Sequence, residues 1–140
     1  MAACPFCSIV AGDEPAHVVL DDPVAVGFLD NRPLFPGHVL VVPRAHVEVL
    51  TDLPADDVGH YFLRVQAMAA AVEEACGAQG TFVANNNRVS QSVAHLHVHV
   101  VPRTKGDGLK GFFWPRTRYP DDDAAAATAA AIRNALASAG

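Results

Sequence analysis

Polar and hydrophobic residues alternate most clearly over residues 94–100, where histidine occupies every second position. In a β-strand successive side chains point to opposite faces, so His95, His97 and His99 would project from one face together. The residues that alternate with them would face the core: Ala94, Leu96, Val98 and Val100. Burial of that second face would fix the register, because a shift by one residue would place the imidazoles in the core.

Shorter hydrophobic segments bounded by Gly, Pro, Asp or Asn predict further strands. These strands cover residues 17–21, 24–29, 38–42 and 81–84. A turn at Asp21-Asp22-Pro23 would join the first two, and a polar turn over residues 85–90 would precede the histidine strand.

Helical periodicity is clearest between about Pro54 and Cys76, where apolar residues recur every three or four positions. The apolar face would comprise Val58, Tyr61, Phe62, Val65, Met68, Ala69, Val72 and Cys76. A short helical turn over residues 4–11 would end at Gly12, and the alanine-rich stretch 124–139 predicts a C-terminal helix.

Composition indicates a globular protein that binds neither nucleic acid nor membrane. The chain has 140 residues, 51% hydrophobic content and a net charge of −5, with no basic stripe and no apolar run of spanning length. We expect a single domain over residues 1–140, with a core over 1–103 and a loop and helix extension over 104–140. Three cysteines and the absence of a secretory signal predict a reducing, cytoplasmic environment.

The histidine strand carries the candidate chemistry. An imidazole near neutral pH can act as nucleophile, acid, base or metal ligand, so a three-histidine metal site is one alternative. The neighbouring Gln91-Ser92-Val93 and the residues 85–87 (Asn-Asn-Asn) offer amides, a hydroxyl and backbone N–H groups. These donors suit phosphate oxygens better than they suit a metal ion.

A second candidate site is the pair Cys4-Pro-Phe-Cys7. A zinc ion would need two further ligands, for which His46 and one histidine of the strand are available. The alternative is two reduced, partly buried thiols. Residues 103–120 form no predicted element, and Phe112, Phe113 and Trp114 in this segment could cover a ligand or pack on the domain or a partner subunit.

The chain resembles the histidine triad (HIT) nucleotide-binding hydrolases, whose signature is His-φ-His-φ-His-φ-φ with φ apolar. Residues 95–101 (His-Leu-His-Val-His-Val-Val) fit it at every position. The preceding Gln91-Ser92-Val93, the segment 36–46 and the segment 28–33 are also typical of the family, and the resemblance runs from Cys4 to about Arg103. Ser90 stands where the family usually has glycine.

The resemblance implies an α+β fold with an antiparallel sheet of about five strands, one main helix and a C-terminal helix. It also implies a covalent mechanism, in which His97 attacks the α-phosphate of a nucleotide and water then releases the nucleoside monophosphate, with adenine as the expected base. The other implied roles are these: His99 and His38 support catalysis; Gln91, Ser92 and Asn85 hold the phosphate; Asp30 contacts the ribose; Phe28 and Ile9 flank the base.

A structural zinc ion on Cys4, Cys7, His46 and His95 is likewise implied, with no organic cofactor. The expected partners are a nucleotide substrate (an AMP derivative or a dinucleoside polyphosphate) and a second copy of the chain in a homodimer. The alternatives within this reading are a nucleotidyltransferase or phosphorylase, and a nucleotide-binding module without turnover.

Overall fold

The computed structural model describes residues 3–109 and 116–139. The chain divides into two compact units, residues 1–107 and 108–140. The expectation of one domain over the whole chain stays a prediction, and Phe112, Phe113 and Trp114 lie outside the described residues. No helix among the described residues is long and apolar enough to cross a membrane.

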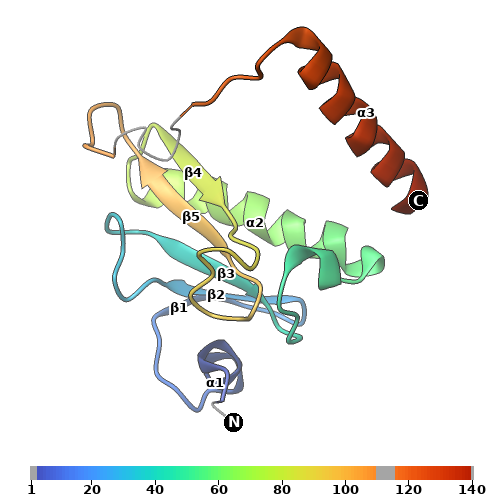
Figure 1. The fold of residues 1–140 in the computed structure, drawn as a ribbon. Helices are drawn as coiled ribbons and strands as arrows, with labels where there is room; N and C mark the ends of the chain where they lie inside the picture. The colour runs from blue at the N-terminus through green and yellow to red at the C-terminus, as the bar shows by residue number, and fades with distance from the viewer. Residues whose placement is uncertain (1–2, 110–115, 140) are drawn as a thin grey trace. The chain divides into compact units, whose positions relative to one another are not determined.

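The first unit is built on a five-stranded antiparallel sheet (Figure 1). Its strands are β1 (Val18–Asp21), β2 (Ala25–Leu29), β3 (Val39–Pro43), β4 (Gly80–Ala84) and β5 (Val98–Arg103). They pair in the order β1-β2-β3-β5-β4, so β1 and β4 are the edges. The α+β prediction is confirmed, and the limits predicted for β1 to β4 agree with those observed to within one residue, whereas β5 begins and ends later than predicted.

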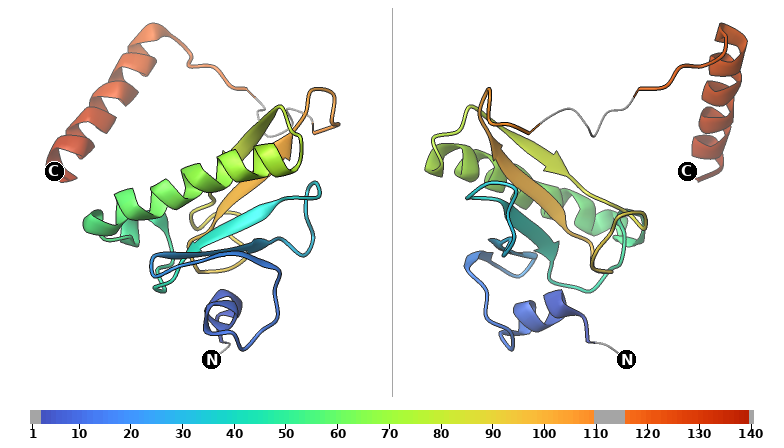
Figure 2. Two further views of the ribbon diagram at one scale, coloured as in Figure 1. Left: turned by 180° about the vertical axis from the view of Figure 1, so that it is seen from behind. Right: turned by 60° about the vertical axis from the view of Figure 1, so that its left-hand side comes forward.

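Each face of the sheet packs against one helix (Figures 1 and 2). Alternate strand residues that include Val39 and Val41 contact α2 (Ala55–Ala75). The intervening residues, which include Phe28 and Leu40, contact α1 (Pro5–Ala11) through Phe6. The period of two in β2 and β3 therefore contributes alternate residues to two separate hydrophobic clusters.

Helix α2 buries a narrower stripe than its sequence predicts. Tyr61, Val65, Met68 and Val72 are buried against the sheet. Val58 and Phe62 are each 36% exposed and Cys76 is exposed, so only part of the predicted apolar face is buried. A helix that lies flat on a sheet contacts it along one row of side chains, and these three residues lie beside that row. A short 3-10 helix over Leu50–Asp52, which the sequence did not predict, precedes α2.

The histidine segment forms a strand only in its second half. Strand β5 begins at Val98, so His95 and His97 precede it. Their segment is held by other bonds: the Leu96 N–H donates to the Val47 carbonyl (2.7 Å), and the His97 carbonyl accepts from Asn85 Nδ2 (3.1 Å). Alternation nevertheless continues, because Leu96, Val98 and Val100 are all buried. Ala94 is exposed, which corrects its assignment to the core.

The second unit contains α3 (Asp122–Ala139), as the alanine-rich stretch predicted. Asp121 precedes the helix and caps its N-terminus, because its Oδ1 accepts a hydrogen bond from the Ala124 N–H at 2.8 Å. Asp122 and Asp123 occupy the first turn, where the helix dipole favours negative charge.

Candidate functional site

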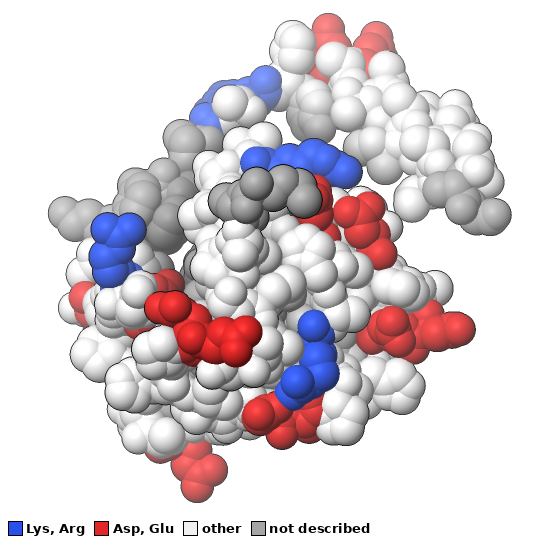
Figure 3. All heavy atoms as spheres, turned by 90° about the horizontal axis from the view of Figure 1, so that it is seen from below, with Lys and Arg blue, Asp and Glu red and all other residues white. Residues whose placement is uncertain are grey.

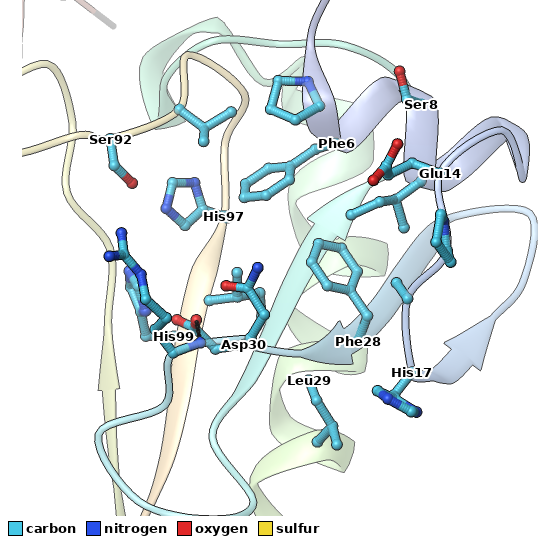
Figure 4. A pocket seen from close by; sticks show the side chains of 18 of the residues that line it. Phe6, Ser8, Glu14, His17, Phe28, Leu29, Asp30, Ser92, His97 and His99 are labelled. Carbon is cyan, nitrogen blue, oxygen red and sulfur yellow. Dashed lines mark hydrogen bonds between the residues drawn. The ribbon is translucent and has the colours of Figure 1, made fainter.

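An open cleft of about 1200 Å³ lies on the α1 side of the sheet. Figure 4 shows His97, His99 and Ser92 at one end, Phe6 and Phe28 at the centre, and Ser8, Glu14 and His17 at the other end. The cleft therefore brings imidazoles, aromatic walls and polar groups together, as a ligand site requires.

The protonation of His97 follows from its hydrogen bond. Its Nδ1 lies 2.8 Å from the His95 carbonyl oxygen, which can only accept, so Nδ1 carries the proton. Nε2 of the neutral ring is then an unprotonated nitrogen with a free lone pair. Phe6 packs edge-on against the same ring, with centroids 5.1 Å apart. The side chain of His97, 2% exposed, is thus held in one orientation and one tautomer.

A chain of hydrogen bonds also fixes the tautomers of His38 and His99. The Leu34 backbone N–H donates to His38 Nδ1 at 3.1 Å, so the proton of the neutral His38 ring is on Nε2. Nε2 lies 2.9 Å from His99 Nδ1 and donates to it. His99 therefore carries its own proton on Nε2, and this N–H is free to donate to a ligand in the cleft.

Burial lowers the pKa of both His38 and His99 and so favours their neutral rings. Desolvation, reinforced by the nearby His97 and His38 rings, lowers the pKa of His99 to about 4. Desolvation also lowers the pKa of His38, which the Asp30 carboxylate 3.6 Å away partly opposes. The cleft thus presents His99 as a neutral hydrogen-bond donor beside His97.

Asp30, His38 and His99 could in principle hold a metal ion, because one ligand atom of each lies within 4.8 Å of the others. The hydrogen bonds argue against it. His38 Nδ1 already accepts a hydrogen bond and the ring proton is on Nε2, so binding a metal through Nε2 would require an imidazolate. The alternative of a three-histidine metal site is not supported either. Nδ1 of His95 lies near Cys4 and Cys7, whereas His97 and His99 line the cleft.

The second cluster has the dimensions of a zinc site. Nδ1 of His95 lies 3.5 Å from each of the sulfurs of Cys4 and Cys7, and Nδ1 of His46 lies 3.2 Å from the Cys7 sulfur and from His95 Nδ1. Zn–N and Zn–S bonds of normal length place tetrahedral ligand atoms roughly 3.3 to 3.8 Å apart.

The outer hydrogen bond of His95 suits the same role. Its Nε2 donates to the Pro43 carbonyl at 2.9 Å, which leaves Nδ1 as a lone pair that faces the two sulfurs. Desolvation lowers the pKa of His95, and desolvation with the nearby Cys4 raises the pKa of Cys7. A cation bound among these groups would favour the unprotonated ligand forms, a neutral imidazole and a thiolate. The residues therefore fit a structural zinc ion.

The predicted substrate-binding residues are not all in the cleft. Phe28, Asp30 and Ser92 line it, as does Ile9. Asn85 lies behind His97, where it donates to the His97 carbonyl. Gln91 holds its own loop, since its Nε2 donates to the Glu48 carbonyl and its Oε1 accepts from the Arg88 N–H.

This loop contains strained backbone. Ser90 has φ +59°, in the left-handed region that favours the glycine usual in the family, and Arg88 has φ +69°. Non-glycine residues adopt such angles where the surrounding structure demands it, often beside functional sites.

Sequence reasoning missed three contributors. Phe6 joins the two sites, because it lies between Cys4 and Cys7 in sequence and contacts His97 in space. The backbone N–H of Leu34 sets the tautomer of His38. Arg32 lines the cleft. Only Phe6 carried a signal in the sequence, as an aromatic residue inside the cysteine pair.

Charge is mixed over the face seen in Figure 3, where single Lys and Arg side chains lie among Asp and Glu. No continuous basic stripe crosses that face, consistent with the net charge of −5.

Comparison with known proteins identifies the family. The HIT domain model matches residues 11–106. A structure from Streptococcus mutans UA159 is 33% identical, covers 97% of this chain and 87% of its own, and superposes with a TM-score of 0.88.

Two further relatives carry informative names. A Zn-bound histidine triad family protein from Mycobacterium smegmatis is 38% identical, with 99% and 98% of the two chains covered and a TM-score of 0.73. The adenylylsulfatase HINT3 of Arabidopsis thaliana is 31% identical over 108 residues, which cover 76% of this chain and 55% of that protein. Together with the paired histidines of the cleft, these matches show that the chain belongs to the HIT family.

Proposed function

We propose that the chain is a nucleotidyl hydrolase that releases a nucleoside monophosphate, AMP in the first instance, through a covalent intermediate on His97. The observation that carries the proposal is the hydrogen bond from His97 Nδ1 to the His95 carbonyl, because it leaves Nε2 as a free lone pair in a nucleotide-sized cleft. Membership of a family with a named adenylylsulfatase supports the choice of AMP.

In the first step Nε2 of His97 forms a bond to the α-phosphorus while the bond to the leaving group breaks. The electron pair of that bond departs with the leaving group. The Nε2–H of His99 donates a hydrogen bond to a phosphate oxygen or to the departing atom, and Ser92 offers a second donor at the same end of the cleft.

In the second step a water oxygen attacks phosphorus and the P–N bond breaks. Its electron pair returns to Nε2, and the proton of the water leaves through the phosphate or solvent. Asp30 would contact the ribose hydroxyls, while Phe6, Phe28 and Ile9 would flank the base. Asn85 and Gln91 would act from behind, by holding the His97 carbonyl and the 85–92 loop.

A structural zinc ion on Cys4, Cys7, His46 and His95 is part of the proposal. When bound, zinc would cross-link α1 to the histidine segment. It would hold Phe6 against His97 and hold the His95 carbonyl where the His97 Nδ1–H donates. Such a zinc–thiolate site would fit the predicted cytoplasmic location, which keeps thiols reduced.

We also propose a homodimer through α2 and β4. β4 is a sheet edge with an exposed Val83, and α2 carries the exposed Phe62 and Leu63. Light scattering after size exclusion would give twice the chain mass, 29.4 kDa from 14.7 kDa per chain, if this is right.

The function is tested by steady-state hydrolysis of an adenosine 5′-phosphoramidate or phosphoanhydride, with AMP release as the measured rate. Wild-type protein should turn over, and His97→Ala should lose about a thousandfold or more of kcat. His60→Ala, a substitution of an exposed α2 histidine, is the matched control. Saturable AMP binding without turnover would indicate a binding module, and turnover that requires added phosphate would indicate a phosphorylase.

A further inference from the structure

Arg32 is the only Lys or Arg among the described residues that line the cleft. Three other arginines of the first unit are paired: Arg44 with Asp21, Arg64 with Asp22 and Arg103 with Asp107. Arg32 forms no ion pair with any residue that the structure describes. An unpaired guanidinium in a cleft is available to a ligand.

The backbone of Arg32 is fixed at the His99 end of the cleft. Its N–H donates to Asp30 Oδ1 at 2.9 Å, and the other oxygen of the same carboxylate lies 3.6 Å from His38 Nε2. His38 in turn donates to His99. Three successive contacts, through Asp30 and His38, therefore connect the Arg32 backbone to the His99 ring.

The charge of the cleft makes this cation significant. The other fixed charges that line the cleft are the carboxylates of Glu14 and Asp30, and the net charge of the whole chain is −5. A substrate with two or more anionic groups is repelled by such a site unless a local cation offsets them. Arg32 is the described residue that supplies one.

Leaving groups differ in what they require. An amine must take up a proton as the P–N bond of the substrate breaks, whereas sulfate or phosphate departs with its electron pair as an anion and needs none. The pKa of the His99 imidazolium is about 4, so the ring is neutral at pH 7 and has no imidazolium proton to transfer. Its Nε2–H can donate a hydrogen bond, but giving up that proton would leave an imidazolate. A guanidinium stabilises a departing oxyanion through two parallel hydrogen bonds.

We propose that Arg32 binds the leaving group and selects substrates that release a tetrahedral oxyanion, phosphate or sulfate, over those that release an amine. The inference rests on the proposed function and narrows its substrate class. Arg32 is a specificity-determining residue in this account, and Glu14 lies at the opposite end of the cleft (Figure 4).

The test compares three substrates that share the adenylyl group: adenosine 5′-phosphosulfate, ADP and adenosine 5′-phosphoramidate. Arg32→Gln should lower kcat/KM for the oxyanion-releasing substrates by roughly 10- to 100-fold, the range for a hydrogen bond to a charged group. It should change kcat/KM for the phosphoramidate by less than about threefold, within the range of weak exposed interactions. Arg32→Lys should restore part of the loss, because it keeps the charge without the fork. The sulfate and phosphate arms show which oxyanion is preferred.

Arg133→Gln, on α3, is the control for net charge and should change none of the three rates. Equal losses for all three substrates in Arg32→Gln, or no loss for the oxyanion-releasing pair, would overturn the inference and leave the hydrolase intact. Failure of wild-type protein to cleave any of the three would overturn the proposed function itself, and the inference with it. Arg32 is exposed, and thermal melts of each variant would verify that folding is unchanged.

Discussion

Removal of one zinc ligand should separate the stability that metal supplies from the stability of the fold. His46 is the ligand to change, because it is exposed and its loss opens no cavity in the core. Its Nδ1 lies 3.2 Å from both the Cys7 sulfur and His95 Nδ1. His46→Ala therefore leaves three ligands and removes one corner of the tetrahedron.

The magnitude follows from linkage. At saturating zinc, each tenfold loss of affinity lowers the free energy of unfolding by about 1.4 kcal/mol. Loss of a direct ligand should lower the zinc affinity by at least about 100-fold, because mutation of a residue that only hydrogen-bonds to a ligand already lowers metal affinity by 10- to 100-fold. The expected loss is about 2.7 kcal/mol, or roughly 10 °C in Tm for a chain of this size. Without metal the variant should lose under about 1 kcal/mol, the range for an exposed hydrogen bond.

The assay is thermal unfolding of wild type, His46→Ala and the control His60→Ala, each with excess zinc and with excess EDTA. Wild type and His60→Ala should melt about 10 °C higher in zinc than His46→Ala does. All three should melt within about 3 °C of one another in EDTA. If zinc does not raise the Tm of wild type, or raises that of His46→Ala equally, the assignment of this ligand set is wrong.

Three further predictions concern the fold and its pH response. Gly37→Ala should lower the free energy of unfolding, because φ is +98° and the new Cβ would clash with Cys76 Sγ. Adding Cys76→Ala should relieve the clash but not the backbone strain of roughly 1 kcal/mol, and urea unfolding would measure both effects. Tyr61→Phe should cost about 1–2 kcal/mol in the same assay, because the buried hydroxyl donates to the Val41 carbonyl at 2.7 Å. The folded pKa of His99 is about 4 against an unfolded value near 6.5, so the unfolded chain binds the proton first. Its contribution to stability is complete above pH 6.5 and is lost as pH falls toward 4; His99→Asn should flatten this part of the profile of unfolding free energy relative to wild type.

Much of the fold could be predicted from periodicity alone. The short apolar segments around β2 and β3 became central strands because their alternate residues meet a helix on each face. The buried stripe on α2 is narrower than its apolar face, because spacing shows which residues share a side of a helix, not how wide a contact a flat sheet permits. β5 starts late because residues 95–97 bond to Val47 and Asn85, far away in sequence, instead of joining the ladder.

The candidate site was predictable as a set of residues but not as a set of tautomers. The histidines and cysteines are visible in the sequence, whereas the partition of His95 to the cysteines and of His97 and His99 to the cleft depends on long-range packing. The protonation pattern depends on backbone groups, the His95 carbonyl and the Leu34 N–H, which no side-chain pattern reveals. Gln91 looked like a phosphate ligand, yet the structure engages its amide in the loop, and its role in binding stays a prediction.

The central claim is that His97 forms a covalent bond to phosphorus. Rapid-quench mass spectrometry of the intact protein, mixed with an adenosine 5′-phosphoramidate or phosphosulfate, tests it most directly. The account predicts a transient species heavier by one adenylyl group in wild type and its absence in His97→Ala, with the same species in His60→Ala. AMP release by wild type with no adduct at any time, or an adduct that persists in His97→Ala, would contradict it.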